Sequence, residues 1–175
     1  MKKTKCTLSF LMLSGLLLMG SCKKEEPQPI PQPTSEPINN PVTITNSFTA
    51  LVDGVEFNEA YYTGLESPGA NSIVITATAQ GNFPSIGLAF PNTITPGTYT
   101  FQGSFGSRRG IYNVSNSANG QYSASNGTGT LEIISHNLNT NEIEGKFSFV
   151  ASPNMGNSNT NTYNITEGKF AIKYN

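Results

Sequence analysis

The sequence predicts an all-β domain at residues 42–175, folded as an antiparallel β-sandwich or a small closed barrel of about nine to ten strands. Two observations carry this prediction. Apolar and polar residues alternate with a period of two, and strand-breaking residues recur roughly every eight to twelve positions. No stretch of the region has the longer period of an amphipathic helix. The choice between sandwich and barrel stays open at this stage.

The first half of the domain is divided by clear turn signals. Asp53 and Gly54 stand between two apolar runs, which is a strong signal for a two-residue hairpin. Pro91 closes one alternating run, and Pro96-Gly97 marks a turn before the next. The predicted strands cover residues 48–52, 55–57, 73–78, 86–90 and 98–101.

The second half contains a short internal echo. Its predicted strands cover residues 128–134, 142–151 and 163–174. Glu-Gly-Lys-Phe occurs at residues 144–147 and again at residues 167–170. We expect two strands of one antiparallel sheet, with Glu and Lys facing water and Phe147, Phe149, Phe170 and Ile172 in the core. A glycine at the same place in both indicates a bulge or close packing against an aromatic ring.

Residues 1–21 are predicted to be a secretory leader. A lysine-rich start precedes an apolar stretch at residues 8–19, which is too short to span a bilayer. The Met-Gly-Ser-Cys of residues 19–22 resembles the lipobox of bacterial lipoproteins, with methionine in place of the usual leucine. The resemblance implies cleavage before Cys22 and attachment of diacylglycerol to its sulfur. The alternative is an ordinary signal peptide with a chance cysteine.

Residues 22–41 are predicted to join the lipid anchor to the domain. The Lys-Lys-Glu-Glu of residues 23–26 resembles the signal that follows the lipidated cysteine in surface-exposed lipoproteins of Bacteroidota. That resemblance implies a place on the outer face of the outer membrane; the bland alternative is a solvated charge cluster. The proline-rich residues 27–41 favour an extended, disordered spacer that reaches roughly 45 Å, at about 3.1 Å per residue.

Charge and chemistry predict neither an enzyme nor a cofactor. Without the leader, seven basic residues stand against eleven acidic ones, a net charge of −4, so a nucleic-acid partner is not expected. His136 and Asp53 are the sole residues of their types, and we expect each in a turn. No serine has a nucleophile-elbow setting, and with Cys22 acylated no His/Cys cluster is left for a metal.

Residues 102–129 form the most unusual stretch of the domain. Tyrosine and arginine are interleaved there with glycine, serine and asparagine, a composition typical of binding loops. The alternative is a hairpin with a long loop whose tyrosines pack on the sheet. The binding interpretation gives a candidate contact set of Tyr61, Tyr62, Arg108, Arg109 and Tyr112.

Three motifs resemble a family of uncharacterised Bacteroidota lipoproteins. They lie at residues 48–57, 96–101 and 165–175, and together they span nearly the whole domain. The family implies an anchored β domain and supplies no functional residue. We therefore expect a lipid-anchored protein of the outer membrane, at the cell surface or facing the periplasm, with a non-catalytic domain that binds a glycan or a protein. The alternative is a structural or accessory lipoprotein of an envelope complex.

Overall fold

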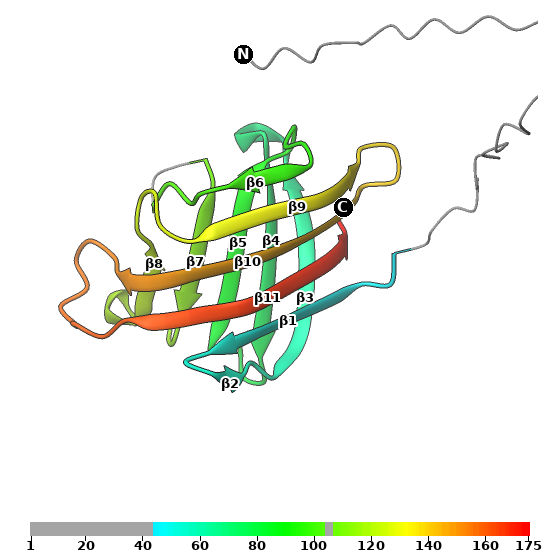
Figure 1. Ribbon diagram of the computed structural model, residues 1–175. Coiled ribbons are helices and arrows are strands. Elements are labelled where there is room, and N and C mark those ends of the chain that lie inside the picture. The colour runs from blue at the N-terminus through cyan, green and yellow to red at the C-terminus, as the bar shows by residue number, and fades with distance from the viewer. Residues whose placement is uncertain (1–43, 104–106) are drawn as a thin grey trace, which may run out of the picture. The chain divides into compact units, whose positions relative to one another are not determined.

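Strands joined by short turns make up the part of the chain that the computed structural model describes, residues 44–103 and 107–175 (Figure 1). This part belongs to a compact unit, Pro41–Asn175. The predicted leader, Cys22 and the linker lie outside the described residues. The strands are β1 (Ser47–Val52), β2 (Val55–Glu56), β3 (Glu59–Ser67), β4 (Ser72–Ala79), β5 (Ser85–Pro91), β6 (Gly97–Tyr99), β7 (Arg109–Asn113), β8 (Gln121–Ala124), β9 (Thr130–Asn137), β10 (Glu142–Pro153) and β11 (Tyr163–Lys173).

All eleven strands belong to one antiparallel sheet, which confirms the all-β prediction. Its main path runs β2-β1-β11-β10-β8-β7-β5-β4-β3. One edge of β10 is shared, because residues 142–148 pair with β9 while residues 151–153 pair with β8. Strand β6 in turn pairs with β9. The path therefore turns at β10, and the sheet curls back over itself.

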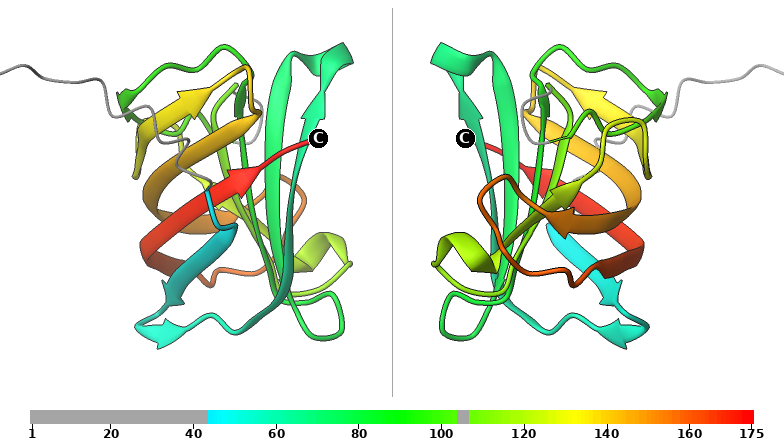
Figure 2. Two further views of the ribbon diagram at one scale, coloured as in Figure 1. Left: turned by 90° about the vertical axis from the view of Figure 1, so that its right-hand side faces the viewer. Right: turned by 90° about the vertical axis from the view of Figure 1, so that its left-hand side faces the viewer.

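The curled sheet is a half-barrel with two walls (Figure 2). One wall contains β1, β9, β10 and β11, and the other contains β3, β4, β5 and β7 (Figures 1 and 2). At the seam, the backbone N–H of Glu66 donates to the carbonyl of Asn175 (2.7 Å), and the N–H of Asn175 donates to the carbonyl of Gly64 (3.3 Å). The fold thus lies between the two predicted forms: it has the two walls of a sandwich within one sheet that bends like a barrel.

Phenylalanine and glycine pack reciprocally at the centre of the β10–β11 pair. Phe147 stands opposite Gly168, and Phe170 stands opposite Gly145. A Cβ atom added at either glycine would lie 2.5 Å from the opposing ring, so only glycine fits. The ring centroids of Phe147 and Phe170 are 6.3 Å apart, and the centroid of Phe48 is 5.4 Å from that of Phe147. This arrangement confirms that the two copies lie in one antiparallel sheet and that their glycines pack against aromatic rings; it also shows that the two strands pair directly.

The first hairpin also forms as predicted. Asp53 and Gly54 connect β1 to β2 with positive φ angles of 50° and 78°, as a two-residue turn between twisted strands requires. The carboxylate of Asp53 accepts a hydrogen bond from the backbone N–H of Asn164 at 2.8 Å. The single aspartate of the chain therefore fastens this turn to β11.

Three strands were not predicted. Strand β3 lies at an edge of the main path and exposes Tyr61 and Leu65. Strands β7 and β8 fall within residues 102–129 and form a hairpin whose Tyr112 and Tyr122 are buried. For those two tyrosines, the structure thus confirms the alternative in which they pack on the sheet.

The expectation that His136 lies in a surface turn was wrong. His136 is partly buried on β9. Its Nδ1 lies 2.8 Å from the carbonyl oxygen of Ile94, and its Nε2 lies 2.8 Å from the hydroxyl oxygen of Tyr174. Because a carbonyl only accepts, Nδ1 carries a proton, and in the neutral ring Nε2 accepts from Tyr174. The histidine links β9 to the segment that follows β11.

We predict that Gly168→Ala destabilises the domain by about 1–3 kcal/mol, because the new methyl group would overlap the ring of Phe147. Chemical denaturation followed by circular dichroism measures the free energy of unfolding. Gly69→Ala is the matched control, since nothing lies within 4 Å of the position of its added Cβ. Equal stability of the two variants would contradict the packing described above.

Candidate functional site

The five predicted contact residues do not converge on one site. Along the sheet, Tyr62 is in register with Ala77, Ala77 with Ile86, and Ile86 with Tyr112. Tyr62 and Tyr112 therefore share the inner face but stand on strands separated by β4 and β5. Tyr61 and Arg109 lie on the outer face of the same wall.

Tyr112 belongs to a cluster of tyrosines inside the half-barrel. It is 5% exposed, and its ring centroid lies 4.9 Å from that of Tyr163, which lies 4.8 Å from that of Tyr122. Burial, with smaller contributions from Tyr163 and Asp53, raises the pKa of Tyr112 to about 12. The side chain also lines a depression of about 370 Å³ beside Val55. Tyr112 therefore contributes a neutral phenol and a packed ring.

Arg108 is held by the segment around β6. Its Nε donates to the carbonyl of Thr100 at 3.0 Å, and its guanidinium carbon lies 5.4 Å from the ring centroid of Tyr99. The second contact is a cation–π interaction. The hydroxyl of Tyr99 in turn donates to the carbonyl of Thr95 at 2.9 Å. Arg108 thus packs against the segment around β6.

Arg109 lies on the outer face of β7. Its neighbour Gly110 is buried beneath the ring of Phe149, so the alternation of β7 places Arg109, Ile111 and Asn113 on the outside. Within the described part of the chain, the Arg109 guanidinium makes neither a hydrogen bond nor an ion pair. It lines two adjoining depressions of about 260 and 300 Å³.

We call this surface the Arg109 face. It is defined by the outward residues of the second depression, namely Arg109, Ile111, Asn113, Gln121, Ser123 and Asn154. A polar row crosses it in register, from Ser85 on β5 through Asn113 on β7 to Gln121 on β8. The amide nitrogen of Asn113 donates to the hydroxyl of Ser85 at 3.3 Å. The face is therefore polar, with a single cation at one end of it.

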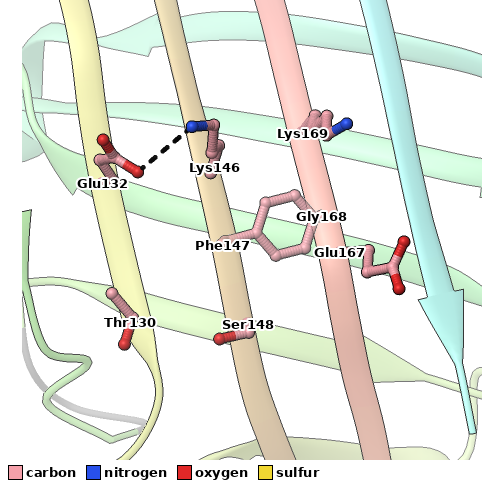
Figure 3. A pocket seen from close by; sticks show the side chains of 8 residues that line it. All are labelled: Thr130, Glu132, Lys146, Phe147, Ser148, Glu167, Gly168 and Lys169. Atoms are coloured by element: carbon pink, nitrogen blue, oxygen red, sulfur yellow. Dashed lines mark ion pairs between the residues drawn. The ribbon is translucent and has the colours of Figure 1, made fainter.

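A larger depression of about 540 Å³ lies on the outside of the other wall, across β9, β10 and β11 (Figure 3). Its charged side chains are Glu132, Lys146, Glu167 and Lys169. The Nζ of Lys146 lies 3.7 Å from Oε2 of Glu132, and the two side chains are 53% and 44% exposed. An ion pair this exposed contributes at most about 1 kcal/mol.

The two walls consequently differ in what they can bind. In the larger depression two lysines are accompanied by two glutamates, and one pair already interacts (Figure 3). Its charge is balanced, so the depression has no preference for an ion of one sign. On the Arg109 face one cation stands among uncharged side chains: three amides, one hydroxyl and Ile111. The Arg109 face is therefore the stronger candidate for recognising a charged ligand.

Sequence reasoning singled out Arg109 but missed the amides beside it. Asn113, Gln121 and Asn154 look like ordinary turn residues in a stretch rich in glycine and serine. The available signal was the alternation Arg109-Gly110-Ile111-Tyr112, which places arginine on one face of a strand and tyrosine on the other. Within the described residues no group of three or more His, Cys, Asp and Glu could hold a metal ion. The same residues include no helix long and apolar enough to cross a membrane.

The fold and the Arg109 face define a class: a small all-β module built from one curled antiparallel sheet. Comparison with known families identifies it further. The model of a domain of unknown function, DUF6252, matches residues 44–172, so the chain belongs to that family. No curated protein and no solved structure matches the chain.

We predict that Tyr112→Phe removes a tyrosine that ionises near pH 12. A pKa raised by folding means that the folded protein holds the proton between pH 10 and 12 after the unfolded chain has lost it. The free energy of unfolding should therefore decline across this range in the wild type, and less steeply in Tyr112→Phe. Tyrosinate absorbance and denaturation at each pH measure both effects. Tyr61→Phe, at an exposed position, is the control. If it flattened the decline in the free energy of unfolding as much as Tyr112→Phe does, the decline could not be assigned to Tyr112.

Proposed function

We propose that the protein is a lipid-anchored lipoprotein of the outer membrane, displayed at the cell surface, whose half-barrel is a non-catalytic binding module. The observation that carries the anchoring is the Met-Gly-Ser-Cys of residues 19–22 directly after an apolar stretch. Acyl chains on Cys22 and its amino group would hold the protein firmly, since each buried CH₂ contributes about 0.8 kcal/mol. The predicted spacer would carry the domain away from the membrane surface.

The Arg109 face supports the binding role. Its residues come from the paired strands β7 and β8 and from Asn154, which follows β10, rather than from a long loop. The backbone N–H of Asn154 donates to the carbonyl of Gln121 at 3.1 Å, and the Asn157 side-chain amide donates to the same carbonyl at 2.8 Å. Side chains held on paired strands need little reordering to bind, which favours affinity.

The lipid anchor is tested by Cys22→Ala. We expect the wild-type protein to incorporate labelled palmitate in cells and to sediment with membranes. The variant should incorporate none and should fractionate with soluble proteins, because no sulfur is left for diacylglycerol. Thr49→Ser, at an exposed position of β1, serves as a handling control with both behaviours intact. Palmitate labelling of Cys22→Ala would refute the assignment.

Surface display is tested by replacing residues 23–26 with four alanines. We expect protease shaving and antibody labelling of intact cells to detect the wild type and to miss the variant, while both remain membrane-bound. Equal labelling of the two would show that the charged segment is not the export signal. Failure to label either in intact cells, with labelling after the outer membrane is opened, would favour the periplasm-facing accessory role.

A further inference from the structure

We infer that the Arg109 face binds an acidic glycan, with Arg109 holding a carboxylate or sulfate group and the neighbouring amides holding sugar hydroxyls. The inference deepens the proposed function and rests on it, because it assigns a ligand class to the binding module. It is carried by the contrast between two adjacent arginines and by the set of neutral polar side chains beside one of them.

The contrast between Arg108 and Arg109 is chemical as well as geometric. Arg108 has a hydrogen-bond acceptor, Thr100, and an aromatic ring, Tyr99. Arg109 is only partly exposed, and its guanidinium has no such partner within the described part of the chain. A planar guanidinium presents its N–H groups as a fork that matches two oxygens of a carboxylate or sulfate. Arg109 is thus the group on this face that could recognise an acid.

The surroundings of Arg109 suit a sugar. Asn113 and Gln121 supply amides that can both donate and accept hydrogen bonds, which is what sugar hydroxyls require. The Asn113 amide donates to Ser85, while its Oδ1 makes no hydrogen bond with the described residues. The hydroxyl of Ser123 donates to the amide oxygen of Asn154, which orients that amide beside the depression. The amides of Asn113 and Asn154 are therefore held in position before a ligand arrives.

The shape of the face also favours a glycan over a peptide. Strand β7 is paired with β5 on one side and β8 on the other, so it has no free edge to which a peptide strand could add. Gly87 and Ala89 of β5 flank β7, and a Cβ atom added at Gly87 would lie 3.6 Å from the Cβ of Ile111, its partner in register. Each depression lies at or just below the lower end of the usual range for ligand pockets, about 300–1,000 Å³, in keeping with one sugar residue.

The test uses the full mature protein, purified from membranes in detergent, and isothermal titration calorimetry. The probes are polygalacturonate and dextran sulfate, with neutral dextran and polyglutamate as comparisons. We expect the wild type to bind at least one acidic glycan, more weakly as salt is added, and to bind neutral dextran at least tenfold more weakly. Arg109→Gln should weaken binding of the acidic glycan about tenfold or more, as loss of a charge-assisted contact implies.

Arg108→Gln is the matched control, because it removes the same charge one residue away, from a side chain that packs against Thr100 and Tyr99. It should retain the wild-type affinity within about twofold, and so should Lys169→Gln on the other wall. Arg109→Lys keeps the charge but loses the fork, so we expect an intermediate affinity. If Arg109→Gln fails to fold, the affinity of Asn113→Ala for the acidic glycan tests the same site.

Several outcomes would overturn the inference, and they separate it from the proposed function. An unchanged affinity in Arg109→Gln, or equal losses of affinity in Arg108→Gln and Arg109→Gln, would show that the glycan does not bind at the Arg109 face. Stronger binding of polyglutamate than of either acidic glycan, lost in Arg109→Gln, would keep the binding module and replace the glycan by an acidic peptide. No binding of any probe by a lipidated, surface-labelled protein would overturn the ligand class and favour the accessory role.

Discussion

The reciprocal packing of Phe147 on Gly168 and of Phe170 on Gly145 is the constraint on which the half-barrel depends. It lies on β10 and β11, and β10 is the strand from which the main path and the β9–β6 branch divide. Each glycine leaves room for a ring that would otherwise have to leave the core. The ring of Phe170 also meets that of Phe90 on β5, at 6.1 Å between centroids. The same rings thus join β10 to β11 and one wall to the other.

The core also determines which residues reach the Arg109 face. The ring of Phe149 occupies the space where a side chain at Gly110 would lie, and Tyr112 packs beside Tyr163. Because side chains alternate along a strand, these two inward residues force Arg109 outward. Core packing therefore determines where the candidate site lies. Its chemistry depends on the outward residues, whose types the core does not constrain.

Sequence reasoning reached those parts of the fold whose signal lies within one segment. The repeat at residues 144–147 and 167–170 indicated two strands of one sheet. In the structure, each copy supplies the glycine and the ring that the other requires. Sequence reasoning missed β7 because the alternation at residues 109–112 is short and stands among glycine, serine and asparagine, which are typical of turns. It misplaced His136 because Ile94 and Tyr174 are remote in sequence. Of the predicted contact set, Tyr61 and Arg109 face outward from one wall, while Tyr112 serves the core.

The hydrogen bonds of Asn175 at the seam cover part of the edge of β3, which bears on how copies of the protein meet one another. Strand β3 is the last on its side of the sheet, and an unpaired strand edge recruits strands from neighbouring molecules. Asn175 occupies the backbone groups of Gly64 and Glu66, and the hydroxyl of Tyr62 reaches across to the carbonyl of Asn46. The molecule thereby shields part of its own edge with its own chain. Many copies could then stand close together without joining sheet to sheet.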